Sequence, residues 1–119
     1  MKYIALIYAN RELEPEFGTP EFARYMNGYR TCNETYAADG VMLGGEALQS
    51  VDVATTIRVR NGRTEAMDGP FIETKEQLGG YYLLDCPDLD TAIRYAAMIP
   101  TAQFGSVEIR PIADVSGLV

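Results

Sequence analysis

The segment from residue 2 to residue 9 constrains the fold more than any other part of the sequence, because it is apolar on both of its faces. Its alternate residues form two sets, which are Tyr3, Ala5 and Ile7 on one side and Ile4, Leu6 and Tyr8 on the other. This period of two predicts a β-strand, and residues 81–86 also read as a buried strand. An open antiparallel sheet normally leaves one polar face for water, so a sheet built from these strands must be covered on both sides.

Two segments carry the signals of helices. Thr19-Pro20-Glu21 supplies an N-cap, a first helical residue with a fixed φ and an acid in the first turn, and Gly40 supplies a C-cap. Between them apolar residues recur at three- and four-residue steps, which predicts an amphipathic helix of about five turns. A second helix is predicted to begin at Pro87-Asp88-Leu89-Asp90 and to end by Pro100.

The remaining strands are interrupted or joined by glycine. Residues 41–43 have strand character that Gly44-Gly45 interrupts, either with a bulge or with a close backbone approach. Residues 53–60 and 63–67 flank Asn61-Gly62, the strongest short-range signal of a β-hairpin. A last strand is predicted at residues 106–112, where apolar and charged side chains alternate.

The predicted order is strand, helix, strand, hairpin, strand, helix, strand, within one domain that spans residues 1–119. This order predicts an α+β fold with a ferredoxin-like antiparallel sheet and two helices on one face. The helices cover only that face, although the strands are apolar on the other face as well. We therefore expect a homodimer in which a second copy covers the open face and buries more than about 2,000 Å² in total.

The charge and the apolar runs of the chain exclude several classes of partner. The net charge of −7, from 17 acidic and 10 basic residues, disfavours binding to nucleic acid or to anionic lipid. No run reaches the about 18 apolar residues of a membrane span, and Met1-Lys2 leads directly into the first strand. A cytoplasmic location without a membrane partner is expected.

The chain contains no histidine, which removes Ser-His and Cys-His nucleophile pairs and the commonest zinc and iron ligand sets. Cys32 and Cys86 lack C-x-x-C spacing and are predicted to be buried and reduced. Asp85, Asp88 and Asp90 lack the glycine and the terminal glutamate of a calcium loop, and no phosphate-binding glycine motif is present. We therefore expect neither a metal nor another cofactor.

A charged segment between two backbone breaks lies just past the middle of the chain. Asp68-Gly69-Pro70 places a permissive residue beside one with a fixed φ, so the backbone must turn there, and Phe71 gives the turn an apolar anchor. Glu73, Lys75 and Glu76 follow, and Gly79-Gly80 ends the segment. Charged loops held by rigid strands often form the rim of a binding site.

The block from Asp68 to Glu76 closely resembles the signature of the DGPF, or DGPFAETKE, branch of the YCII-related proteins, and only Ile72 departs from it. The likeness continues over residues 1–8, 43–48, 77–80, 87–90 and 106–111, so it covers nearly the whole chain. The resemblance implies a dimeric α/β barrel, in which two sheets pack face to face.

Acidic residues are the candidates for proton transfer. Asp68 is predicted either as a general base or substrate-orienting carboxylate at the mouth of a cleft between helices and sheet, or as the side chain of an Asx-turn. Glu46 follows the Gly44-Gly45 irregularity, where a side chain can be re-aimed, and an ordinary edge charge is the alternative. Glu73, Lys75 and Glu76 could line the same cleft as Asp68 or could be solvated loop charges.

Arginines are the candidates for holding an anionic substrate. Arg58 and Arg60 share one strand face and Arg110 lies on the last strand, so guanidinium groups could clamp a carboxylate. Pairing with Glu65 or Glu108 across strands explains these arginines equally well.

Tyrosines are candidate phenol donors for an aromatic or enol-like ligand. They are Tyr8, Tyr25, Tyr29, Tyr36, Tyr81 and Tyr82. A tyrosine at core spacing is also explained as a core residue with its hydroxyl at the edge.

The resemblance also implies a His-Asp pair, with the histidine on the first helix and the aspartate before the following strand. Asp39 stands at about the place of the aspartate, while Met26 or Asn27 stands where the histidine would be. Asp39 is therefore the one candidate carried over from the pair. A structural role in the turn at Gly40 is its alternative.

Two functions agree with these features. The first is lyase or isomerase chemistry on a small anionic substrate, which the resemblance implies because dimeric α/β barrels host such reactions. The second is a non-catalytic ligand-binding or regulatory module associated with transcription control, since a fold does not by itself decide function. A carboxylate with a raised pKa in the cleft would favour the enzyme, and an apolar cleft ringed by exposed charge would favour the binder.

Overall fold

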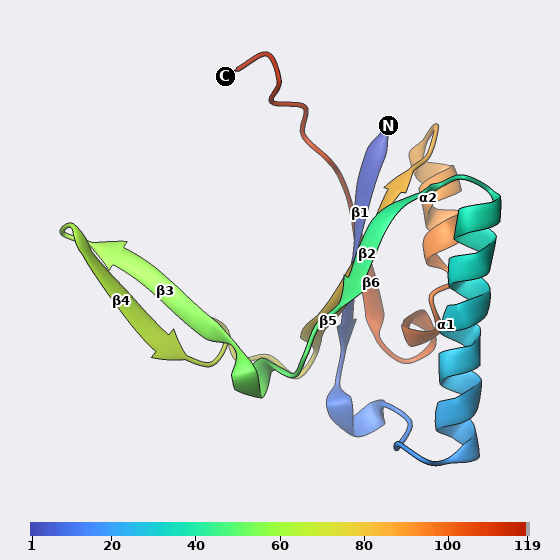
Figure 1. The fold of residues 1–119 in the computed structure, drawn as a ribbon, viewed down its shortest axis with the longest axis horizontal. Helices are drawn as coiled ribbons and strands as arrows, with labels where there is room; N and C mark the ends of the chain where they lie inside the picture. The colour runs from blue at the N-terminus through green and yellow to red at the C-terminus, as the bar shows by residue number, and fades with distance from the viewer. Residues whose placement is uncertain (119) are drawn as a thin grey trace.

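A computed structural model describes residues 1–118 (Figure 1). Its strands are β1 (Lys2–Ala9), β2 (Met42–Ala47), β3 (Thr55–Arg60), β4 (Arg63–Asp68), β5 (Gln77–Asp85) and β6 (Ser106–Pro111). Its helices are α1 (Pro20–Ala38) and α2 (Leu89–Ala96), and the 3-10 turns are η1 (Arg11–Leu13), η2 (Val51–Val53) and η3 (Pro100–Gln103).

Four of the strands form one antiparallel sheet in the order β2-β5-β1-β6. Both helices lie on the same side of this sheet (Figure 1). The α+β prediction is confirmed, and the strand order is consistent with a ferredoxin-like fold. Within residues 1–118 the sheet is open and does not close into a barrel.

The core lies between the helices and the sheet. The sheet contributes Tyr3, Ala5, Ile7, Tyr82 and Leu84, and the helices contribute Cys32, Tyr36, Ala92 and Ala96. The Tyr36 ring packs edge-on against the ring of Tyr82, with centroids 5.1 Å apart, and its hydroxyl donates to the Tyr95 carbonyl. Burial raises the pKa of the Cys32 thiol and of the Tyr36 phenol. Both cysteines are free and buried, as predicted.

The predicted helix caps are confirmed. The Thr19 hydroxyl accepts a hydrogen bond of 3.1 Å from the Phe22 amide, and Pro20 is the first residue of α1. Gly40 has a φ of +69°, so it ends α1 in a conformation that other residues rarely adopt. Asp88 caps α2 by accepting from the Thr91 amide at 2.8 Å, and this hydrogen bonding lowers the pKa of its carboxyl group.

The irregularity predicted at Gly44-Gly45 is confirmed, whereas the predicted break at Gly79-Gly80 is wrong, and both glycine pairs lie inside strands. β2 continues through Gly44-Gly45, with a register shift between Met42 and Gly44. β5 begins at Gln77, before Gly79-Gly80. A Cβ atom at Gly45 would lie 2.8 Å from the Tyr82 ring, and one at Gly80 would lie 2.9 Å from the Glu46 carbonyl oxygen. Close approach therefore requires glycine at both positions.

Strands β3 and β4 form a separate two-stranded sheet, which we call the hairpin arm (Thr55–Asp68). Its turn residues Asn61 and Gly62 have φ values of 54° and 73°, so the predicted hairpin is confirmed. The arm projects away from the four-stranded sheet, on the side opposite the helices (Figure 1). The radius of gyration is 16.6 Å, against about 13 to 14 Å for a compact domain of this length.

The sheet face opposite the helices, which we call the open face, carries half-buried apolar side chains. They are Ile4, Leu6, Tyr8, Tyr81 and Leu83. Within residues 1–118 no helix covers this face (Figure 1). Nor is any helix in this part of the chain both long and apolar enough to cross a membrane.

Candidate functional site

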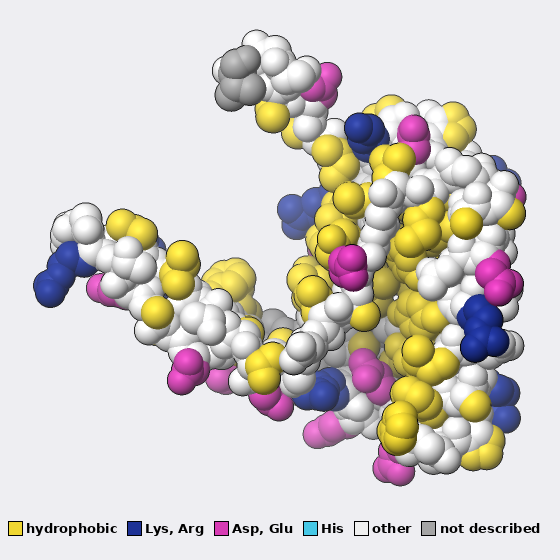
Figure 2. Space-filling model, viewed as in Figure 1, with side chains coloured by type: hydrophobic (Ala, Val, Ile, Leu, Met, Phe, Trp, Pro, Cys, Tyr) yellow, Lys and Arg dark blue, Asp and Glu magenta, His cyan; other side chains and the backbone are white. Residues whose placement is uncertain are grey.

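A cleft of about 450 Å³ lies between α1 and the β2–β5 edge of the sheet. Gly45 and Gly80 are among the residues of β2 and β5 that line it. Apolar walls come from Ile7, Ala9 and Met42. Figure 2 shows hydrophobic side chains gathered along the groove between the sheet and α1. The interior of the cleft is therefore mainly apolar.

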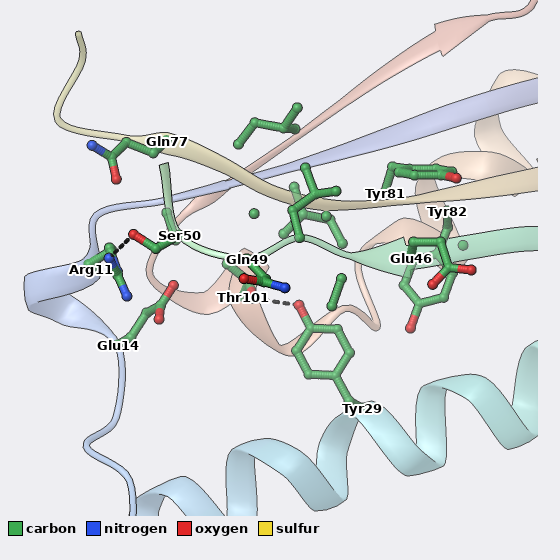
Figure 3. Close-up of a pocket in the computed structure, with 18 of the residues that line it drawn as sticks. Arg11, Glu14, Tyr29, Glu46, Gln49, Ser50, Gln77, Tyr81, Tyr82 and Thr101 are labelled. Atoms are coloured by element: carbon green, nitrogen blue, oxygen red, sulfur yellow. Dashed lines mark hydrogen bonds between the residues drawn. The ribbon is translucent and has the colours of Figure 1, made fainter. Parts of the chain in front are cut away.

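Three hydroxyl groups meet inside the cleft. The phenol oxygens of Tyr25 and Tyr29 each lie 2.6 Å from Oγ1 of Thr101, which is 2% exposed. Tyr25 and Tyr29 are one turn apart on α1, so both phenols point to the same place (Figure 3 shows the Tyr29 contact). Burial, as the largest cause, raises the pKa of Tyr29 well above its usual value, so this phenol stays neutral and able to donate.

A second polar pair lies one turn further along α1. The Tyr82 hydroxyl donates to Oδ1 of Asn33, and both residues line the cleft. Burial raises the pKa of Tyr82 as well. The polar groups of the interior are therefore neutral hydroxyls and an amide.

Charged and amide side chains surround the mouth of the cleft. They are Arg11, Glu14, Gln49 and Gln77, with Ser50 beside them (Figure 3). Arg11 donates to the Ser50 hydroxyl and lies 3.5 Å from a carboxylate oxygen of Asp52. Among the described residues that line the cleft, Arg11 is the only arginine or lysine, so it is the group that would meet an entering anion.

Five of the site candidates predicted from the sequence border this cleft, namely Tyr25, Tyr29, Glu46, Tyr81 and Tyr82. Glu46 and Tyr81 lie directly opposite each other across β2 and β5, on the open face, whereas Tyr82 lies on the other face and reaches Asn33 of α1. Lys75 lines a shallower neighbouring hollow that also includes Arg11 and Asp52.

The other predicted site residues lie elsewhere. Asp68 and Arg58 belong to the exposed hairpin arm, and Glu73 is exposed in the segment before β5. Tyr8 lies on β1 and Arg110 on β6. Arg110 pairs with Glu108 of the same strand, whereas the alternative interpretation expects a pair across strands. The structure therefore does not bring the predicted carboxylates and arginines into one cluster.

The turn at Asp68 is held by its neighbours. The Gly69 amide donates to the Ala54 carbonyl at 2.7 Å, and the Thr56 hydroxyl donates to the Gly69 carbonyl at 2.8 Å. Gly69 has a φ of 95°, which explains why glycine is needed there. These bonds close the base of the hairpin arm. Within residues 1–118 the Asp68 side chain makes no Asx-turn hydrogen bond, contrary to the Asx-turn that was the structural alternative for this residue.

The sequence analysis missed several residues of the cleft. Thr101, Asn33, Arg11 and Gln49 carried no motif. The spacing of Tyr25, Tyr29 and Asn33 on α1 is the one signal that could have found part of the site, because residues four apart share a helix face. Thr101 reaches the cleft only through the fold, since 72 residues separate it from Tyr29.

Metal ligands do not gather in the described part of the chain. Within residues 1–118 no three side chains of the His, Cys, Asp or Glu type come together as a group that could hold a metal ion.

Comparison with known proteins agrees with the fold and the length of the chain. The profile of the YCII-related domain matches residues 1–116. The chain belongs to the YCII-related family. A family relative from Rhizobium meliloti, described as an uncharacterized protein, is 36% identical over 115 residues, which cover 95% of this chain and 93% of the relative.

The His-Asp pair implied by the family resemblance has no counterpart here at the positions compared. Met26 lines the cleft, while Asp39 is the C-cap of α1 and accepts a hydrogen bond of 2.8 Å from the Tyr95 hydroxyl. Both positions belong to the same straight helix and its cap, so they are about 20 Å apart at a rise of 1.5 Å per residue. Asp39 in this YCII-related protein is thus placed for the structural role in the helix end.

Proposed function

We propose that this YCII-related protein is a homodimer that binds a small, oxygen-bearing anionic molecule in the cleft between α1 and the β2–β5 edge. The observation that carries the proposal is the hydroxyl cluster at Thr101. Three hydroxyl groups share two hydrogen bonds at 2.6 Å, so one hydroxyl hydrogen remains. When Thr101 donates to one tyrosine, the hydrogen of that tyrosine is free to bind a ligand oxygen.

Three further features support an anionic ligand with an apolar body. Neutral phenols donate hydrogen bonds to an anion and carry no negative charge that would repel it. Arg11 supplies a cation at the mouth of the cleft. The apolar walls exclude water from the donors, which strengthens each hydrogen bond. The block from Asp68 to Glu76 supports placing the chain in the DGPF branch of the family.

The test measures ligand retention. Protein purified from cells is examined by native mass spectrometry for a retained small molecule. Small carboxylates and enols, including any compound found in this way, are then titrated into the protein by calorimetry. Tyr29→Phe removes one donor and should weaken binding at least about tenfold, because a hydrogen bond to a charged group contributes about 1.5 to 3 kcal/mol. Tyr95→Phe is the matched control, because that hydroxyl bonds Asp39 outside the cleft. Equal affinity for Tyr29→Phe and the parent would contradict the proposal.

Catalysis is a second candidate, and Glu46 is the observation that favours it. It is the one predicted proton-transfer carboxylate on the strands that border the cleft, and it lies opposite Tyr81 on the open face. Lyase or isomerase chemistry would need such a carboxylate to move a proton of the bound substrate. Glu46→Gln should then abolish turnover of the bound compound and leave its affinity within about threefold. Binding with no turnover in the parent protein would favour the regulatory, non-catalytic alternative.

The homodimer is supported by the open face of the sheet. Five bulky side chains of β1 and β5 remain half-buried there, whereas an open face is normally polar. A second copy would cover them with the same set of side chains. Light scattering at micromolar concentration checks this, and a folded particle of 13.1 kDa would contradict it.

A further inference from the structure

The hairpin arm has one apolar face that is exposed. The strand register places Ile57 opposite Ala66 and Val59 opposite Thr64, so these four side chains share a face. Ile57 is 65% exposed and Val59 is 58% exposed. A two-stranded hairpin is at best marginally stable in water unless its apolar face packs against something. This face therefore requires a covering surface from outside the described chain.

The root of the arm adds further exposed apolar side chains. Phe71 is 68% exposed and Ile72 is 54% exposed, directly after the turn at Gly69. Phe71 thus does not anchor the turn by packing into the body, as the sequence predicted. The arm and the segment that follows it thus carry four bulky apolar side chains that are more than half exposed, namely Ile57, Val59, Phe71 and Ile72.

The charge of the arm is opposite to that of the rest of the chain. Three arginines and two acids give the segment 55–68 a net charge of +1. Because the total is −7, the rest of the chain, which we call the body, carries a net charge of −8. A weakly basic arm is attracted to the acidic body of a second copy.

We propose that the arm of one chain crosses to a second copy and packs its apolar face on the body of that copy. The inference rests on the proposed homodimer and adds to it an exchange of arms. The arm projects on the same side as the open face, so two chains that pair through their open faces would each have the partner's arm alongside (Figure 1). The occupant is a second copy because the same side of the sheet already needs one.

The Asp68 to Glu76 block acquires a role in this arrangement. It forms the root of the arm, where Gly69 and the bond from Thr56 fix the direction in which the arm leaves. Its exposed Phe71 lies where the arm meets the dimer. The block is accordingly an assembly element that sets the angle of the arm.

Photo-crosslinking tests the exchange. Val59→p-benzoylphenylalanine places a crosslinker on the apolar face of the arm, and Arg58→p-benzoylphenylalanine is the matched control on the opposite face of the same strand. Isotopically light and heavy chains are mixed before irradiation, so mixed peptides identify links between chains. We expect mixed links at position 59, on residues of the acidic body, at a yield at least fivefold above position 58.

The outcomes separate the two proposals. If light scattering gives a dimer but position 59 links only within its own chain, the exchange is overturned and the proposed homodimer stands. If the parent protein is a monomer, both fail. Position 59 capturing a different protein and never a second copy would also overturn the exchange. The variants lie outside the core, so their folding is not at risk.

Discussion

The four-stranded sheet and the hairpin arm have the same alternating strand pattern but opposite burial. On the sheet Ala5 is 0% and Leu84 is 1% exposed, whereas on the arm Ile57 is 65% exposed. The difference lies in what covers each face, since α1 and α2 pack on the sheet and, within residues 1–118, no helix packs on the arm. The alternation of residues along a strand therefore determines which side chains share a face. The elements that pack against that face determine whether it is buried.

The largest expected effect contrasts a core residue with an arm residue. Leu84→Ala should lower the free energy of unfolding by about 2 to 5 kcal/mol, because it leaves a cavity in the core. Val59→Ala also removes aliphatic side-chain atoms, but from an exposed strand, so it should lower the free energy of unfolding much less. Urea unfolding at two protein concentrations measures both. Under arm exchange only the Val59 effect shrinks on dilution, because its contact with the second copy is lost when the dimer dissociates. Equal losses at both sites would contradict the contrast.

A second comparison uses two glycines. Gly45→Ala should lower the free energy of unfolding by about 1 to 3 kcal/mol, because the new Cβ meets the Tyr82 ring in a packed site. Gly62→Ala in the arm meets no atom within 4 Å but must adopt a φ of +73°, at a cost of about 1 to 2 kcal/mol. Ligand binding separates the two variants. Gly45→Ala should weaken it by changing the cleft floor, and a normal affinity would show that the floor does not contact the ligand.

Alkaline pH should destabilise the body of the chain through its buried tyrosines. It should not destabilise the hairpin arm in this way, because the arm contains no tyrosine. Burial raises the pKa of Tyr36 above its unfolded value of 10.0, so the folded state holds the proton more tightly. The contribution of Tyr36 to the stability is therefore constant below about pH 10 and falls above it, by up to about 1.4 kcal/mol per pH unit. Melting temperatures from pH 8 upward measure the decline, and Tyr36→Phe should make it shallower. An unchanged slope in that variant would contradict the assignment.

The smallest effect is expected for Asp68→Asn. The turn is held by Gly69, Thr56 and the Ala54 carbonyl, so loss of the charge should change the free energy of unfolding by less than about 1 kcal/mol. The variant should remain a dimer with a melting temperature within a few degrees of the parent. A large loss of stability would mean that the carboxylate charge itself supports the fold. Loss of ligand with normal stability would restore its predicted functional role.

Local signals in the sequence predicted the elements well. Thr19, Pro20 and Gly40 bounded α1, and Asn61-Gly62 located the hairpin, because each acts through the backbone within a few residues. Gly79-Gly80 misled the boundary of β5, since glycine signals both chain breaks and close strand approach. Only the Glu46 carbonyl oxygen, contributed by the neighbouring strand β2, distinguishes the two at Gly80.

The site was predicted less well for a different reason. Charge clusters such as Glu73 and Lys75 are visible in a sequence, but neutral hydroxyls become a site only when the fold brings Thr101 to Tyr29. The position of the arm was equally hidden, because the hairpin signal at Asn61-Gly62 contains no information about which sheet the hairpin joins. Both failures concern contacts between segments distant in sequence.

The central position of β1 has a consequence for synthesis of the protein. Of the six described strands β1 is synthesised before the others, and it is paired on one edge by β5 and on the other by β6, which are synthesised after the rest. During elongation β1 must wait with two unpaired edges and two apolar faces, which favours association with other nascent chains. Its pairing with distant segments also makes slow folding the expectation. Yield in cells should therefore depend on chaperone supply more than the stability of the finished protein would indicate.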